Sequence, residues 1–107
     1  MRRNKYGAVK SQCVLGHMHA SKLERNYCDQ LRMLKKNGDI LAYEIQVKYP
    51  LIVFGKLISN HIVDFVVFNK DGSVQAHECK GYETRLWKIK KNLFEALFPA
   101  IKYVVVK

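Results

Sequence analysis

The sequence predicts an α/β fold built on a central mixed β-sheet flanked by helices. Two segments have apolar faces at helical spacing and capping residues, and extended segments lie between and after them. Their order is helix, three-strand meander, helix and final strand, which is typical of a sheet with helices packed on it. The chain has 107 residues, so we expect a single domain over residues 1–107, with a basic N-terminal arm over residues 1–20.

The first helix is expected to begin at Ser21, because Ser21-Lys22-Leu23-Glu24 has the form of a capping box. Gly38 is expected to end it in the left-handed conformation. Its predicted apolar face consists of Leu23, Tyr27, Leu31 and Leu34.

The second helix is expected to run from Thr84, its N-cap, to Leu97, with Pro99 stopping it. Residues 101–106 then form a short apolar strand. The predicted apolar face of this helix consists of Leu86, Ile89, Leu93 and Leu97. Three aromatic residues are assigned to the core, with base stacking as the alternative: Tyr82, Trp87 and Phe94.

The extended segments lie between the two helices. Residues 40–49 and, after Pro50, residues 51–54 read as strands, with a turn at Gly55 and Lys56. Residues 58–68 and 73–80 read as a hairpin joined at Asn69-Lys70-Asp71-Gly72.

The charge balance favours polyanionic partners. Lys and Arg number 19 against 9 acids, which gives a net charge of +10 and an isoelectric point near 9.7. No apolar run approaches the roughly 18 residues of a spanning helix, and no signal-peptide core follows the basic N-terminus. We therefore expect nucleic acid rather than membrane as the partner, and a cytoplasmic location (the host cytoplasm if a phage encodes the chain).

Asp64 stands alone in an apolar strand, Ile62-Val63-Asp64-Phe65-Val66-Val67-Phe68. Burying an isolated carboxylate costs several kcal/mol, so its charge must be paired, hydrogen-bonded or bound to a metal. A buried ion pair or a solvent-facing edge position would explain it without any function.

The register of the following hairpin decides between these readings. A three-residue loop, Lys70-Asp71-Gly72, would place Asp64 directly opposite Glu78, with β-carbons about 4.5–5.5 Å apart. A loop of two or four residues would put them on opposite faces. Lys80 is two residues beyond Glu78 and shares its face.

Two facing carboxylates favour a bound cation, and oxygen ligands with room for water suit Mg²⁺ or Mn²⁺. Beside such a metal, Lys80 could contact the scissile phosphate and position or deprotonate a water. A plain surface lysine at a strand end is the alternative. A separate hypothesis of a zinc site rests on Cys13, His17 and His19, whose spacing matches no common structural site. We therefore interpret them as ordinary loop or core residues.

Asp64 followed by Glu78-Cys79-Lys80 after a hairpin resembles the PD-(D/E)xK nuclease superfamily, with Val63 where the motif's name has Pro. Three further segments make the resemblance more specific: residues 21–24 at the start of the first helix, Gln46, and residues 80–84. Together they are similar to a family of small phage and prophage nucleases that resemble Holliday-junction resolvases. The resemblance spans residues 5–107 and implies a restriction-endonuclease-like αβββαβ core.

The resemblance also implies a role for each site residue. Asp64, Glu78 and the main-chain carbonyl of Cys79 would bind the metal, and Lys80 would be the catalytic lysine. Glu24 would be a helix-borne acid reaching the metal directly or through water, although the capping box alone explains it equally well. Gln46 would line the site, with a solvent-facing strand residue as the alternative.

The sequence thus predicts a Mg²⁺-dependent endodeoxyribonuclease, selective for branched DNA and acting as a homodimer. A catalytically silent, basic DNA-binding phage protein that retains the nuclease fold is the alternative. The residues expected to contact DNA phosphates are Arg2, Arg3, Lys5, Lys10, Lys22, Lys88 and Lys91. A solvated basic face without a partner is the alternative.

Overall fold

The computed structural model describes residues 11–13, 16, 18–19 and 21–107. The chain divides into two compact units, Met1–Asp39 and Ile40–Lys107. Among the described residues, no helix has the length and apolar character needed to cross a membrane.

The first unit contains a small hairpin and one helix. β1 (Ser11–Gln12) pairs antiparallel with β2 (Met18–His19), a pairing that the prediction of a basic arm did not include. α1 (Lys22–Lys36) begins as predicted, because the Ser21 hydroxyl accepts a hydrogen bond from the N–H of Glu24 over 3.1 Å. Gly38, at φ 80°, follows the helix in the predicted left-handed conformation.

The apolar face predicted for α1 is only partly correct. The buried residues of the helix are Glu24, Cys28 and Leu31, whereas Leu34 is exposed. The inward face is rotated by about one residue from the predicted stripe, so that it includes the Glu24 carboxyl group. Apolar spacing alone misses this rotation, because Glu24 and Cys28 are not counted among the large apolar residues.

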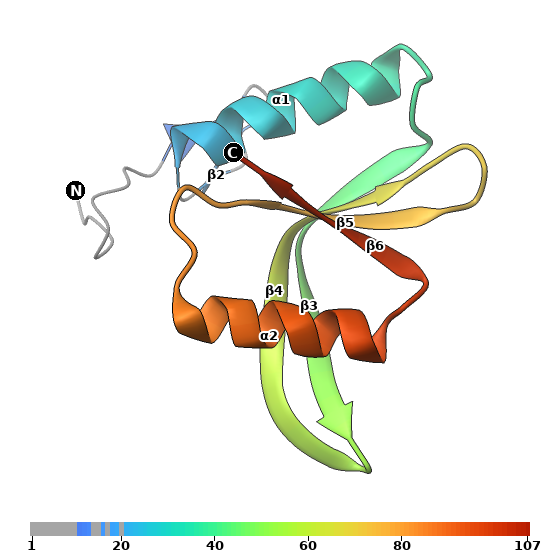
Figure 1. Cartoon of the computed structure of the whole chain (residues 1–107). Helices are drawn as coiled ribbons and strands as arrows, with labels where there is room; N and C mark the ends of the chain where they lie inside the picture. Colours follow the sequence, from blue (N-terminus) through green and yellow to red (C-terminus); the bar gives the residue numbers. More distant parts are fainter. Residues whose placement is uncertain (1–10, 14–15, 17, 20) are drawn as a thin grey trace. The chain divides into compact units, whose positions relative to one another are not determined.

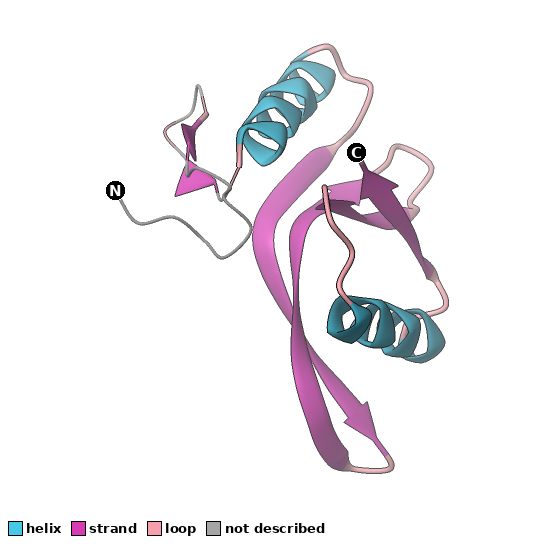
Figure 2. Ribbon diagram, turned by 60° about the vertical axis from the view of Figure 1, so that its left-hand side comes forward, coloured by secondary structure: helices cyan, strands magenta, loops and turns pink. Residues whose placement is uncertain are grey.

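The second unit is a four-stranded mixed sheet with one helix (Figures 1 and 2). The strand order is β3-β4-β5-β6, with β3, β4 and β5 antiparallel and β6 parallel to β5. The prediction of a mixed α/β fold is therefore confirmed. The elements are β3 (Ala42–Val53), β4 (Lys56–Phe68), β5 (Val74–Cys79), α2 (Arg85–Leu97) and β6 (Ile101–Val106).

The first hairpin of the sheet differs from its prediction in two places. β3 continues through Pro50, which is tolerated because β3 is an edge strand and a missing N–H need not break a ladder there. The turn lies at Phe54 and Gly55, not at Gly55 and Lys56, so Lys56 is the first residue of β4.

The second hairpin has the predicted register. The N–H of Asn69 donates to the carbonyl of Ser73 over 2.9 Å, and Gly72 adopts φ 87°. The ladder then runs from Phe68–Val74 to Phe65–His77 without a shift. The three-residue loop is therefore confirmed.

α2 is capped as predicted, because the Thr84 hydroxyl accepts a hydrogen bond from the N–H of Trp87 over 3.1 Å. Its inward face is set by Trp87 and Phe94, both buried as expected, while Leu86 and Ile89 are 65% and 58% exposed. Tyr82 is also exposed, so its assignment to the core is wrong. The larger aromatic rings occupy the core, and the two aliphatic residues are left on the flank. The core cluster consists of Leu51, Val63, Val66, Ala76 and Phe94.

Candidate functional site

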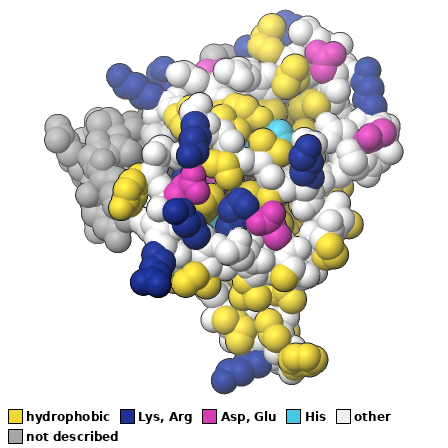
Figure 3. Space-filling view, in the orientation of Figure 1, with side chains coloured by type: hydrophobic (Ala, Val, Ile, Leu, Met, Phe, Trp, Pro, Cys, Tyr) yellow, Lys and Arg dark blue, Asp and Glu magenta, His cyan; other side chains and the backbone are white. Residues whose placement is uncertain are grey.

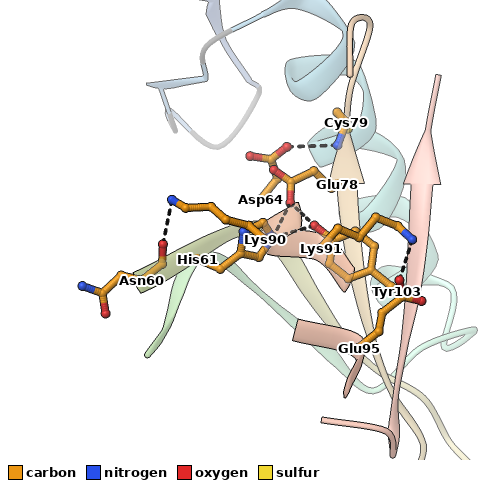
Figure 4. A network of polar contacts seen from close by, with 9 residues as sticks. All are labelled: Asn60, His61, Asp64, Glu78, Cys79, Lys90, Lys91, Glu95 and Tyr103. Carbon is orange, nitrogen blue, oxygen red and sulfur yellow. Dashed lines mark hydrogen bonds and ion pairs between the residues drawn. The ribbon is translucent and has the colours of Figure 1, made fainter. Parts of the chain in front are cut away.

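Asp64 and Glu78 meet where β4 and β5 come together. One step beyond the last ladder pair, Phe65–His77, the same register places Asp64 opposite Glu78. Asp64 Oδ2 also accepts a hydrogen bond from the main-chain N–H of Cys79 over 2.9 Å (Figure 4). The hairpin therefore brings the two predicted carboxylates to one place, with Asp64 anchored to the end of β5.

Glu78 is buried, with 5% of its surface exposed, and is held by two side chains that the sequence analysis did not single out. Its Oε2 accepts a hydrogen bond from the Tyr103 hydroxyl over 2.5 Å. His61 Nε2 lies 2.8 Å from that hydroxyl and 3.5 Å from Glu78 Oε2. Because the single hydroxyl proton goes to the carboxylate, His61 Nε2 must carry the hydrogen that it shares with Tyr103.

The surroundings keep the Tyr103 hydroxyl protonated. Burial raises its pKa above the usual value, and the negative charges of Glu78 and Asp64 raise it further. Tyr103 therefore remains a hydrogen-bond donor to Glu78 at neutral pH. The effect of both carboxylates on one hydroxyl agrees with their placement in a single cluster.

Asp64 also lies at the point in β4 where the alternation of side chains between the two faces of the sheet is interrupted. In a regular strand, residues three apart face opposite ways, yet Val63 and Val66 belong to the same core cluster. Gln46, at φ 51°, stands across from Asp64, in the gap between the ladder pairs Ile45–Phe65 and Val47–Val63. The irregularity therefore crosses both strands at the position of the acid.

Gln46 is exposed, and its conformation is unusual for its residue type. A non-glycine residue with positive φ costs about 1–3 kcal/mol and persists only where the surrounding structure imposes it. Such strain is concentrated at functional sites. The position of Gln46 opposite Asp64 is compatible with the predicted site-lining role.

Lys80 follows β5 and lines a pocket of about 290 Å³ together with Glu78 and Trp87. Its Nζ lies 5.5 Å from the centre of the Trp87 ring, a cation–π distance that holds the amine over α2. Lys90 also lines the pocket and donates from Nζ to the main-chain carbonyl of Asn60 over 3.0 Å. The pocket thus combines an acid with two amines in one hollow.

Glu24, the predicted fourth acid, belongs to the first unit. Its carboxyl-bearing side chain is 3% exposed, and its N–H is bound by the Ser21 cap. The cap is therefore confirmed, and a contact between Glu24 and the Asp64 cluster stays a prediction.

Cys28 lies next to Cys13, one of the three residues of the zinc hypothesis. Cys13 and Cys28 are both buried, are not joined by a disulfide, and have sulfur atoms 3.4 Å apart. His17 and the side chain of His19 lie outside the described residues. Within the described part of the chain, no group of three His, Cys, Asp or Glu side chains is arranged to hold a metal ion.

The residues expected to contact DNA fall into three groups. Arg2, Arg3, Lys5 and Lys10 lie outside the described residues. Lys22 and Lys88 are exposed. Lys91 is half-buried, donates to Glu95 over 2.7 Å and lies 5.2 Å from the centre of the Tyr103 ring.

Comparison with protein families gives a match that covers nearly the whole chain. A family described as "Protein of unknown function (DUF1064)" matches residues 3–107. The chain belongs to the DUF1064 family. Neither the curated proteins nor the solved structures gave a significant match to this DUF1064 chain.

Proposed function

We propose that this DUF1064 protein is a Mg²⁺-dependent endonuclease that cleaves DNA, with branched DNA as its preferred substrate, and that it works in the cytoplasm as a homodimer. The observation that carries the proposal is the placement of Asp64 opposite Glu78 by a three-residue turn, with Lys80 in the same pocket as Glu78. A DNA-binding protein without activity would have no need for this cluster of charge in a sheet. The restriction-endonuclease-like core is part of the same proposal.

The chemistry of the donor atoms fits a hard divalent cation. Asp64 and Glu78 offer carboxylate oxygens, and the carbonyl of Cys79 is the third candidate. In a strand, the N–H and C=O of one residue point to the same neighbouring strand, and the N–H of Cys79 points to Asp64. Mg²⁺ binds through few protein oxygens and keeps several waters, so this small ligand set is sufficient.

A bound Mg²⁺ or Mn²⁺ would supply activation of a water molecule and neutralisation of charge on the phosphate. The chain's own residues supply the geometry. Tyr103 and His61 fix one oxygen of Glu78, and the N–H of Cys79 fixes one oxygen of Asp64. These contacts hold the acids in place before substrate arrives, which is the condition for electrostatic catalysis.

Lys80 is proposed to bind the scissile phosphate and to position the attacking water. Its amine lies within the same pocket as Glu78, so a phosphate oxygen there can contact both the amine and the site of the cation. Hydrolysis then requires the water to release a proton to solvent and to attack phosphorus, while the P–O bond to the leaving strand breaks and the leaving oxygen takes up a proton from solvent. The charge that develops on the phosphate is stabilised by the ammonium group.

The test is a cleavage assay on supercoiled plasmid, four-way-junction and flap DNA, in Mg²⁺, Mn²⁺ or EDTA. We expect cleavage with either metal and loss of at least 100-fold of the rate in EDTA, in Asp64→Asn and in Lys80→Ala. Asp39→Asn and Lys102→Ala are the matched controls, because both residues are exposed and neither lines the pocket.

Two outcomes would contradict the proposal. DNA binding in EDTA without cleavage of any substrate in any metal would favour the silent DNA-binding alternative. Metal-independent cleavage that Lys80→Ala leaves unchanged would exclude the mechanism.

A further inference from the structure

The hairpin of β3 and β4 extends well beyond the rest of the sheet. β5 pairs with β4 only from Phe65 to Phe68, so the part of the hairpin from Val47 to Val63 is a two-stranded ribbon. It projects past α2 in both ribbon views (Figures 1 and 2). We call residues 47–63 the ribbon.

The ribbon carries exposed apolar side chains along its length. Five large apolar side chains have about half or more of their surface in solvent, which is unusual for one small region. They are Ile52 (47%), Phe54 (106%), Leu57 (53%), Ile58 (53%) and Ile62 (51%). In Figure 3, hydrophobic side chains cover the projection at the bottom of the view, with a basic side chain near its end.

Phe54 occupies the tip at a cost to the fold. Phe54 and Gly55 have φ 47° and 78°, the signs of a type I′ turn. The first position of this turn favours Asn, Asp or Gly, and a bulky residue there is strained. Phe54 is therefore both strained and fully exposed, so neither packing nor turn chemistry explains a phenylalanine at this position.

The ribbon's charge points to a polyanion. It carries Lys48 and Lys56 and has no Asp or Glu, since the nearest acids are Glu44 and Asp64. A two-fold dimer formed through the ribbon would bring these lysines near their own copies without a carboxylate on the ribbon to neutralise them. DNA instead neutralises them with phosphates and offers base faces to the apolar tip.

The ribbon also begins at the candidate site. Asn60 and Ile62 line the same pocket as Glu78 and Lys80. DNA whose phosphate is bound in that pocket can continue along the ribbon toward Phe54. Apolar side chains that enter DNA between base steps commonly act together with nearby basic residues on phosphates.

We propose that the ribbon is a DNA-binding element in which Phe54 inserts between bases and Lys48 and Lys56 contact phosphates. This inference rests on the proposed nuclease function, because that function places the scissile phosphate in the pocket at the base of the ribbon. Six residues separate Phe54 from the pocket-lining Asn60, so insertion at the tip would open the base stack roughly 20 Å from the pocket. It would favour junctions and flaps, whose bases are already partly unstacked.

The test measures binding of the full chain to a four-way junction and a matched duplex in EDTA, with 2-aminopurine at the branch point. Phe54→Asn should weaken junction binding about tenfold and abolish the rise in 2-aminopurine fluorescence. Its melting temperature should stay the same or rise, because Asn suits the turn. Leu41→Asn is the matched control, since Leu41 is 59% exposed and lies outside the ribbon.

Unchanged affinity and fluorescence in Phe54→Asn would overturn the inference. So would a change of oligomeric state in ultracentrifugation with DNA binding intact, because the ribbon would then be an interface between copies. The nuclease proposal fails separately. Binding that depends on the ribbon, without cleavage of any substrate, would contradict the nuclease proposal and support the ribbon proposal. Normal cleavage by Phe54→Asn with unchanged binding would contradict only the ribbon proposal.

Discussion

Asp64 accepts a hydrogen bond from the main-chain N–H of Cys79 over 2.9 Å, and this contact joins β4 to the last residue of β5. The contact exists only in the register that the turn at residues 70–72 imposes. A shift by one residue would move Glu78 to the other face of the sheet. The geometry of the candidate site therefore depends on a turn that lies several residues away from it.

Gly72→Ala should lower the free energy of unfolding by about 1–2 kcal/mol, because Gly72 has φ 87° and alanine is strained there. A β-carbon at this position would meet nothing within 4 Å, so the cost comes from the backbone alone. Urea unfolding followed by circular dichroism measures it. Gly81→Ala is the control, since its site is equally open without a positive φ. Equal stability of the two variants would contradict the role of this turn.

Asp71 gives the same turn a pH dependence. Hydrogen bonds from the hydroxyl and the N–H of Ser73 lower the pKa of Asp71. A lowered folded-state pKa means that the stabilisation is present above the ordinary pKa near 4 and is lost as the pH falls through the folded value. NMR titration of the carboxyl carbon should show a higher midpoint in Ser73→Ala than in the wild type. The same midpoint in both proteins would show that the hydroxyl has no part in the shift.

Local signals in the sequence were sufficient for much of this fold. Ser21, Thr84 and Gly72 each act within a few residues of their own position, so their caps and turn could be predicted from nearby residues. Asp64 was conspicuous because its neighbours are apolar. The facing of Asp64 and Glu78 then followed by counting along the hairpin.

Other parts depend on long-range geometry. Tyr103 reaches Glu78 only because β6 pairs parallel with β5 in one register, which is set by the path of α2 between them. His61 is brought to the same cluster by the change of sides near Asp64. The positive φ of Gln46 could not be predicted, because glutamine is not a residue type that favours the left-handed conformation. The prediction that Leu86 and Ile89 face the core was wrong. Helical spacing alone does not show which apolar face of a helix is buried when aromatic residues lie on another face.

Tyr103 and Glu78 should be energetically coupled. Tyr103→Phe keeps the ring that packs against Phe94 but removes the hydroxyl bound to a buried carboxylate, which should cost about 1–3 kcal/mol of stability. Glu78→Gln in the same background should cost less than it does alone, with a coupling of at least about 0.5 kcal/mol. A double-mutant cycle from urea unfolding tests this, and additive costs would count against the hydrogen bond. Tyr49→Phe is the matched control, because the Tyr49 ring also packs against Phe94 and lies outside this network.

Gln46 tests whether strain in β3 serves the site. Gln46→Gly should be more stable than Gln46→Ala by about 1 kcal/mol, because glycine adopts φ 51° without strain. At Lys48, exposed on the same strand and without a positive φ, the order should reverse, since glycine weakens an ordinary strand by roughly 0.5–1 kcal/mol.

Both Gln46 variants lack the amide and should cleave DNA at least tenfold more slowly than the wild type if that group lines the site. Greater stability of Gln46→Gly together with full cleavage would show that the strain is real but that the side chain has no part in the reaction. Lower stability of Gln46→Gly than of Gln46→Ala would show that the chain is not strained at this position.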